Sequence, residues 1–165
     1  MILYHGSDIE ISKPKIIMSE KGRDFGFGFY TTTIQNQAER WAKRIAQLHS
    51  RQDSSKHIPV VSVFEFDEMS KELNTKFFSG PTLDWLDLVV NCRSNIHFKH
   101  DYDIVFGKIA NDNVGETVEY VLAGIMRKED AVERLKFEQI NDQMCFCTEK
   151  ALQRLRFLRS YTLKM

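Results

Sequence analysis

Residues 24–32 read DFGFGFYTT, and this aromatic stretch says more about the fold than any other part of the sequence. Its aromatic and β-branched residues predict a strand, and its interposed glycines predict a tight loop leading into that strand. Thr32 and Gln35 have the spacing of a capping box, which indicates that a helix begins directly afterwards. Apolar residues then recur at helical spacing, so an amphipathic helix is expected to run to about Leu48.

Short strands and further helices are expected on both sides of this stretch. The other expected strands are residues 2–5, 60–66, 73–78, 102–109, 144–147 and 157–163. The other expected helices are residues 80–90, 114–126, 129–137 and 148–155. Strands and helices do not alternate regularly. This order favours an α+β domain with mostly antiparallel pairing over a doubly wound parallel sheet.

Length and composition indicate one globular domain that spans residues 1–165. The apolar fraction is 42% and the charged fraction 28%, which is a globular rather than a disordered composition. Lys and Arg together number 23, as do Asp and Glu, so the formal net charge is +0. A balanced chain has no global field that draws it to nucleic acid or to an acidic membrane.

No segment of the sequence predicts secretion or membrane insertion. Met1 to His5 carry no basic region followed by an apolar run, and no apolar stretch approaches the roughly 20 residues of a membrane span. The three cysteines (Cys92, Cys145 and Cys147) do not form a disulfide framework. We interpret them as small buried apolar side chains; a metal pair of Cys145 and Cys147 would lack two further ligands. A cytoplasmic protein without a metal is expected.

Several common catalytic motifs are absent from the sequence. It contains no GxxxxGK[ST] phosphate loop, no GxSxG elbow, and no HExxH or paired CxxC metal motif. The run of residues 26–28 lacks the third glycine of a dinucleotide fingerprint and precedes a strand instead of following one. A Rossmann domain is therefore excluded.

Three separated segments carry the residues best suited to a ligand: residues 4–7, 24–32 and 142–146. His5 followed by Gly6 offers a ring nitrogen beside a backbone that a ligand can approach closely. An aromatic residue at a strand end offers a flat face, and a cation over such a face gains roughly 0.5–2 kcal/mol. A planar ligand with an amide and a positive ring suits both features, and the nicotinamide of NAD is such a ligand.

In order and residue type these segments resemble the ADP-ribosyltransferase superfamily of the His-Tyr-Glu kind, which includes diphtheria-type toxins and poly-ADP-ribose polymerases. His5-Gly6 matches the His-Gly of that superfamily's first strand. Residues 28–32 and the helix around 37–42 match its glycine-rich run, aromatic strand and helix. The whole chain is similar to an uncharacterised bacterial family within the superfamily, through the segments 102–105, 131–135 and 143–152. The resemblance implies split, mostly antiparallel sheets with peripheral helices around an NAD cleft.

The resemblance also implies a role for each matching residue. His5 would hydrogen-bond a ribose hydroxyl of NAD, and the Gly6 backbone would hold the nicotinamide amide. Tyr30 would stack on the nicotinamide ring. Further cofactor contacts are implied for three neighbours in the same stretch, namely Phe27, Phe29 and Thr31. His5, Tyr30 and Gln143 would form the catalytic set.

Gln143 departs from the superfamily pattern, because a Glu stands at the corresponding place in those enzymes. That Glu orients the nicotinamide ribose and stabilises the oxocarbenium-like charge that develops as nicotinamide leaves. A Gln can hydrogen-bond the ribose, but it supplies no negative charge and no base. Three other carboxylates are candidates to replace that charge, namely Glu116, Glu119 and Glu149. A neutral third residue favours transfer of a single ADP-ribose over polymer synthesis.

The same residues also have ordinary structural interpretations. His5 could be a core or capping histidine, Tyr30 a core aromatic and Gln143 a polar residue at a strand end. Trp41 and Trp85 fall on apolar helix faces and are expected in the core. Arg93 is expected to be solvated at a helix end, with binding of a diphosphate as the alternative.

The functional hypothesis is an NAD-dependent mono-ADP-ribosyltransferase that acts on a protein or nucleic acid. Relatives beside small partner genes imply a toxin or phage-defence effector with an antitoxin partner. A second hypothesis, motivated by Gln143, is a degenerate NAD- or ADP-ribose-binding module or partner scaffold. A third is a nucleic-acid-binding regulator, which rests on a late basic cluster: Lys150, Arg154, Arg156 and Arg159.

Overall fold

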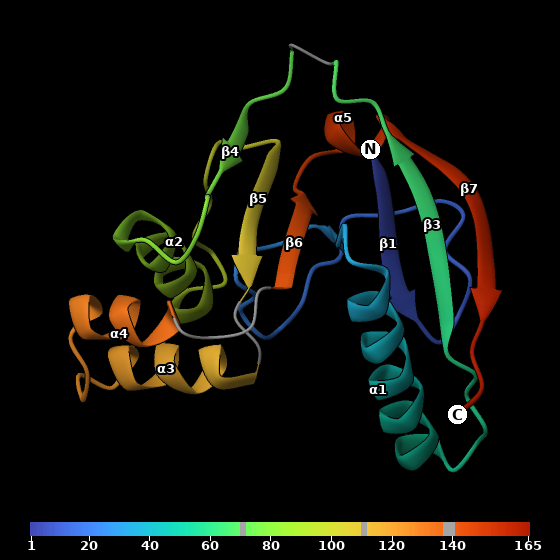
Figure 1. The fold of residues 1–165 in the computed structure, drawn as a ribbon, viewed down its shortest axis with the longest axis horizontal. Coiled ribbons are helices and arrows are strands. Elements are labelled where there is room, and N and C mark those ends of the chain that lie inside the picture. Colours follow the sequence, from blue (N-terminus) through green and yellow to red (C-terminus); the bar gives the residue numbers. More distant parts are fainter. Residues whose placement is uncertain (70–71, 110–111, 137–140) are drawn as a thin grey trace.

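Two small β-sheets stand side by side in the computed structural model, which describes residues 1–69, 72–109, 112–136 and 141–165 (Figure 1). The first sheet is antiparallel and has the order β1-β3-β7, with strands β1 (Ile2–Ser7), β3 (Val60–Phe66) and β7 (Leu155–Thr162). The second has the order β2-β6-β5-β4, with strands β2 (Phe29–Thr31), β6 (Asn141–Phe146), β5 (Ile104–Ile109) and β4 (Thr75–Phe77). Among the described residues of this second sheet, only the short β4 pairs in parallel, with β5, and the other strand pairs are antiparallel.

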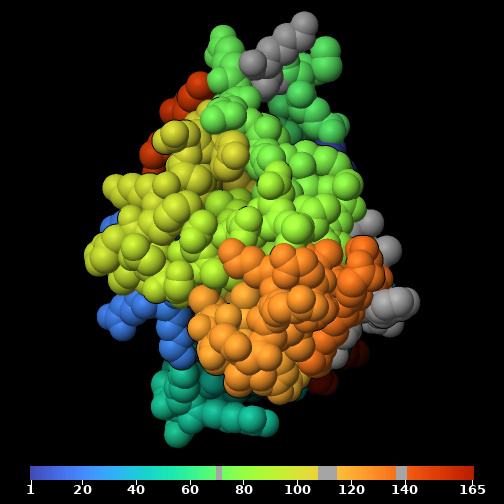
Figure 2. Space-filling model, turned by 90° about the vertical axis from the view of Figure 1, so that its left-hand side faces the viewer, coloured from blue at the N-terminus to red at the C-terminus, as the bar shows by residue number. Residues whose placement is uncertain are grey.

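Helices cover the outer faces of both sheets. The helices of the described residues are α1 (Gln35–Asp53), α2 (Leu83–Ser94), α3 (Asp112–Leu122), α4 (Lys128–Leu135) and α5 (Glu149–Leu152). Helix α1 packs Ala38 and Ala42 against Val61 of the first sheet. Helices α2, α3 and α4 lie on the far side of the second sheet, where they form the outer surface in Figure 2. None of these helices is both long and apolar enough to cross a membrane.

An apolar layer holds the two sheets together. It is built from buried side chains of both sheets and of α5: Leu3, Phe29, Phe64, Phe66, Ile104, Met144, Phe146, Ala151 and Leu152. Burying a large apolar side chain contributes about 1.5–3 kcal/mol, so this layer is a main source of stability. A second core lies between the second sheet and its helices and contains Trp85, as the sequence predicts.

A backbone bridge joins the two sheets through their edge strands β1 and β2. Tyr4 and Thr32 form an antiparallel bridge in which each backbone N–H donates to the other's carbonyl, over 2.8 and 2.9 Å. Asp142 strengthens this junction from β6, because its carboxylate accepts from Thr32 Oγ1 at 2.7 Å and from the Thr33 amide at 2.9 Å. The bridge places the middle of β1 beside the end of β2.

The predicted mixture of helices and mostly antiparallel strands is confirmed, and β3 covers the residues expected. The capping box is wrong. Helix α1 follows Ile34 with no side-chain cap, and the Thr32 hydroxyl lies two residues earlier, where it accepts from the Ile34 amide and donates to Asp142. The core position of Trp41 is also wrong: this side chain is 49% exposed, because α1 packs its alanine face on the sheet. The end of the predicted helix 129–137 lies outside the described residues.

Candidate functional site

A cavity of about 930 Å³ opens where the two sheets join. Its walls come from β1, the loop before β2, β2 itself, α1, the end of α2, and β6. The volume lies within the roughly 300–1,000 Å³ that is usual for ligand sites. Five of the residues singled out in the sequence line it together: His5, Gly6, Tyr30, Thr31 and Gln143. Residues from three distant segments thus meet at one place.

His5 lies on the cavity wall with its ring held from two sides. Its Nδ1 is 2.7 Å from the carbonyl oxygen of Tyr30, and its ring stacks on Phe29 at a centroid distance of 4.4 Å. Since a carbonyl only accepts, the Nδ1 atom carries the proton and Nε2 is left as the acceptor in the neutral ring. Burial lowers the pKa of His5, which favours this neutral form.

Gly6 serves the fold as well as the cavity. A Cβ placed on Gly6 would lie 2.2 Å from the Ala38 carbonyl oxygen and 2.8 Å from the Ala42 nitrogen. Only glycine therefore allows α1 to pack this closely on β1. Its backbone remains part of the cavity lining, where the resemblance expects the nicotinamide amide.

Tyr30 uses its hydroxyl to fold the loop that precedes it. The hydroxyl donates to the Gly26 carbonyl at 2.6 Å and accepts from the Phe25 amide at 3.1 Å. Burial raises the pKa of Tyr30 well above its ordinary value, so the hydroxyl stays protonated. The guanidinium carbon of Arg23 lies 5.4 Å from the Tyr30 ring centroid, so a flat cation already occupies the face of this ring.

The other aromatic and threonine candidates either serve the packing of the fold or lie outside the cavity lining. Phe29 is 1% exposed in the layer between the sheets, and the half-buried Phe27 also lies outside the cavity lining. Thr31 does line the cavity, but its hydroxyl donates to the Met144 carbonyl at 3.0 Å and ties β2 to β6. The sequence could not separate these packing roles from ligand contacts.

Gln143 is held by a carboxylate that the sequence interpretation did not select. Gln143 Nε2 donates to Asp24 Oδ2 at 2.9 Å, and Asp24 Oδ1 lies 2.6 Å from Arg93 Nε. Both Asp24 and Gln143 are less than 10% exposed. Asp24 is the first residue of the glycine-rich stretch, and this position was the one signal in the sequence that could have identified it as a site residue. The carboxylates proposed from the sequence (Glu116, Glu119 and Glu149) are all exposed and lie outside the cavity lining.

Positive side chains dominate the charged part of the cavity wall. Its basic residues are Lys21, Arg23, Arg40, Arg44 and Arg93, and Asp24 is the acidic residue among the lining residues. Arg93 is thus not the solvated helix-end residue that was expected, because it pairs with Asp24. The half-exposed Trp41 ring also lines the cavity, and the Arg44 guanidinium lies over it at 5.7 Å. Such a wall attracts an anionic ligand that carries a flat ring.

The late basic cluster is partly neutralised by acids. Lys150 lies 3.9 Å from Asp103, Arg154 lies 3.5 Å from Glu72, and Arg156 pairs with Glu65. Paired cations present less net charge to phosphates than the sequence suggests. The arrangement gives less support to nucleic-acid binding than the cavity gives to a small anionic ligand.

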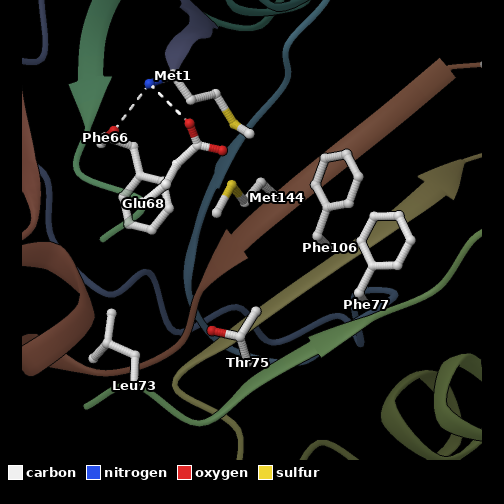
Figure 3. Close-up of a pocket in the computed structure, with 8 residues that line it drawn as sticks. All are labelled: Met1, Phe66, Glu68, Leu73, Thr75, Phe77, Phe106 and Met144. Atoms are coloured by element: carbon white, nitrogen blue, oxygen red, sulfur yellow. Dashed lines mark hydrogen bonds and ion pairs between the residues drawn. The ribbon is translucent and has the colours of Figure 1, made fainter. Parts of the chain in front are cut away.

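A second cavity, of about 370 Å³, lies between the sheets at the other end of the strands (Figure 3). Its lining is mostly apolar, with side chains such as Phe66, Phe77 and Met144. The one ion pair there joins Glu68 to the amino group of Met1 over 3.4 Å. This cavity offers few groups for recognition or catalysis.

A family model matches residues 1–157 of the chain. The chain belongs to the DUF3990 family. That family is described as one of proteins of unknown function. Membership therefore does not assign an activity to this DUF3990 chain, and the function has to be inferred from the geometry of the cavity. Among curated proteins and among solved structures, none matches the chain.

Proposed function

We propose that this DUF3990 protein binds NAD in the larger cavity and transfers a single ADP-ribose to a macromolecular acceptor. One observation carries the proposal: His5, Tyr30 and Gln143 come from three distant segments and line the same cavity. Their order and types resemble the ADP-ribosyltransferases, and their convergence is what a shared site requires. The proposal places the enzyme in the cytoplasm as a toxin or phage-defence effector with an antitoxin partner.

The cavity wall suits the parts of NAD. His5 Nε2 would accept a hydrogen bond from a ribose hydroxyl, and the basic residues would pair with the diphosphate. The nicotinamide ring would take the place of the Arg23 guanidinium on Tyr30, since both are flat cations. Arg23 would then be released to contact the diphosphate.

Gln143 and Asp24 together would do the work of the missing Glu. Because the Gln143 amide nitrogen donates to Asp24, its Oε1 atom is available to accept from the nicotinamide ribose. The bond between ribose C1′ and the nicotinamide nitrogen breaks, and its electron pair leaves with nicotinamide. Asp24 would stabilise the positive charge on the ribose from one hydrogen bond away. An acceptor nucleophile then bonds to C1′ and loses its proton.

The test uses NAD that is labelled on its adenylate part, the purified chain and whole-cell extract. The expected result is labelled acceptor together with free nicotinamide, and loss of both in His5→Ala and Gln143→Ala. Digestion with protease or with nuclease then tells whether the acceptor is a protein or a nucleic acid. A folded chain that neither binds nor consumes NAD would overturn the proposal.

A second candidate is an NAD-binding module without turnover. It is favoured by the 2.6 Å contact between Arg93 and Asp24, because this ion pair offsets the negative charge that catalysis would use. Saturable NAD binding without nicotinamide release, in every extract tested, would identify this function.

A further inference from the structure

Away from the larger cavity, three potential metal ligands meet at the C-terminal end of helix α1. Asp8 follows β1, His49 lies in the last turns of α1, and His57 lies in the loop before β3. Asp8 Oδ2 is 2.7 Å from His49 Nδ1 and 2.6 Å from His57 Nδ1. One carboxylate oxygen and two imidazole nitrogens therefore face a common point.

A second carboxylate orients one of these imidazoles from behind. His57 Nε2 lies 2.7 Å from Asp53 Oδ2 and 3.0 Å from the Ser55 hydroxyl. Asp53 in turn accepts from the Ser55 hydroxyl and amide, which fixes its position. A carboxylate on the far nitrogen holds the ring and selects the tautomer whose other nitrogen can bind a metal, and metal-binding histidines commonly have such a partner.

We propose that Asp8, His49 and His57 bind a divalent transition-metal ion of the zinc class. Two imidazoles and one carboxylate are a donor set for Zn²⁺ and related ions, whereas Ca²⁺ and Mg²⁺ require oxygen ligands. With metal–ligand bonds of roughly 2.0–2.1 Å, tetrahedral ligands lie about 3.3 Å apart. Each contact to Asp8, now 2.6 or 2.7 Å, thus has to open by about 0.6–0.7 Å to reach that spacing, and the 41% exposed His49 side chain has room for such a movement.

The position in the fold favours a cation and gives it a structural effect. The C-terminal end of a helix carries partial negative charge, which stabilises a bound cation. The three ligands come from the segment after β1, from α1 and from the loop before β3. A metal ion here would tie the free end of α1 to the first sheet and raise the thermal stability of the folded chain.

The experiment uses the untagged full-length chain after treatment with a chelator. Zn²⁺ is titrated into it by calorimetry, and melting curves are recorded with and without Zn²⁺. We expect one equivalent to bind and to raise the Tm. His49→Gln and His57→Gln should each weaken binding by about a hundredfold and abolish the Tm increase, whereas Asp53→Asn should weaken it by about tenfold.

Two control variants make the result specific. His97→Gln removes an exposed imidazole elsewhere, and Cys147→Ser removes the most accessible thiol; both should bind Zn²⁺ as the wild type does. Co²⁺ should give the visible spectrum of a nitrogen- and oxygen-ligated ion, with the same band shape in Asp53→Asn. Absence of binding, or binding that persists in both His49→Gln and His57→Gln, would overturn the proposal.

Discussion

Gln143 Nε2 donates a hydrogen bond to Asp24 Oδ2 over 2.9 Å, so a residue of β6 is tied to the loop that precedes β2. The other oxygen of Asp24 lies 2.6 Å from Arg93 Nε, which brings in the end of α2. Asp24 is 8% exposed, and each of its two carboxylate oxygens accepts a hydrogen bond, as buried polar groups in proteins generally do. The neutral Gln143 is therefore backed by a carboxylate that is itself paired with Arg93, and any test of the site has to treat Asp24 and Gln143 together.

Asp24→Asn should remove most of the NAD turnover and leave NAD binding measurable. The substitution keeps the shape of the side chain but removes the charge that would stabilise the developing oxocarbenium. A preorganised electrostatic contact of this kind is worth about a hundredfold in rate. Nicotinamide release by the purified variant measures the effect, and calorimetric titration with NAD measures binding.

Asp142→Asn is the matched control for this variant. Asp142 is the neighbour of Gln143 and is also buried, but it binds Thr32 and Thr33 and does not line the cavity. Both substitutions weaken hydrogen bonds to a charged group and should each cost about 1–3 kcal/mol of stability. Equal loss of turnover in the two folded variants would show that Asp24 acts only through the fold.

Gln143→Glu should destabilise the protein at neutral pH, although it restores the residue of the ADP-ribosyltransferase pattern. The new carboxyl would stand where an amide now donates to Asp24 over 2.9 Å. Two carboxylates this close do not both ionise, so the pKa of the introduced group rises above the ordinary value of about 4.3. In its protonated form the introduced carboxyl can lie beside Asp24 without repulsion, so the stability that it provides is present at acid pH. That stability is lost as the pH rises through the raised pKa and the second carboxylate ionises.

Melting temperatures at pH 5 and pH 8 test this prediction. The Tm of Gln143→Glu should fall further below that of the wild type at pH 8 than at pH 5. The double variant Asp24→Asn/Gln143→Glu should regain most of the lost Tm because one of the two charges is removed. A single variant that is as stable as the wild type at pH 8 would contradict the expected repulsion.

Much of the fold follows from local sequence patterns. The β-branched and aromatic content of residues 60–66 predicts β3 with its observed bounds, and helical periodicity predicts α1. Residues 24–32 form the tight loop and the strand that their glycines and aromatic residues predict, and the Tyr30 hydroxyl holds the loop before β2 by binding the backbone of Phe25 and Gly26. A tyrosine's choice of partner is not visible in strand propensity.

Contacts between distant residues account for what the sequence could not predict. Asp24 and Gln143 are separated by 119 positions, and only its place at the start of the glycine-rich stretch distinguishes Asp24 locally from the other carboxylates. The exposure of Trp41 likewise depends on which face of α1 meets the sheet. That choice is made by the close approach of Gly6 to Ala38, and it leaves Trp41 at the cavity.

His5 should make the folded protein less stable as the pH falls below about 6.5. Burial lowers its folded pKa below this unfolded value, so between the two values the unfolded chain takes up a proton that the folded chain does not. The free energy of unfolding therefore has its full value, as far as His5 is concerned, above about pH 6.5, and it declines as the pH becomes more acid. His5→Gln, which does not titrate, should show a flatter fall in Tm between pH 7 and pH 5. Parallel curves would contradict the lowered pKa.

Gly6→Ala should unfold or severely destabilise the protein, by more than about 3 kcal/mol. The added methyl group would meet the backbone of α1 at 2.2 Å, and a helix backbone cannot yield as a flexible side chain does. Gly80→Ala is the control, since no atom lies within 4 Å of a Cβ at that position. Urea unfolding of both variants gives the comparison, and a Gly6→Ala variant of wild-type stability would contradict the observed packing.

Cys147 should be the reactive thiol of the chain at neutral pH. Its sulfur lies 3.5 Å from the Cys145 sulfur and 4.0 Å from His100 Nε2, and these neighbours lower the pKa of Cys147 to about 6. Burial raises the pKa of Cys92 to about 12 and that of Cys145 well above its ordinary value, so both stay protonated. The thiolate is the nucleophilic form, and Cys147 is the one cysteine of the three that is not fully buried.

Iodoacetamide at pH 7 should therefore label one site, with a rate that rises around pH 6 and is lost in Cys147→Ser. His100→Gln should shift that midpoint upward, while Cys92→Ser should leave it unchanged. Labelling that is shared among the cysteines, or a midpoint near the ordinary thiol value of about 8.5, would show that the neighbours do not stabilise the thiolate.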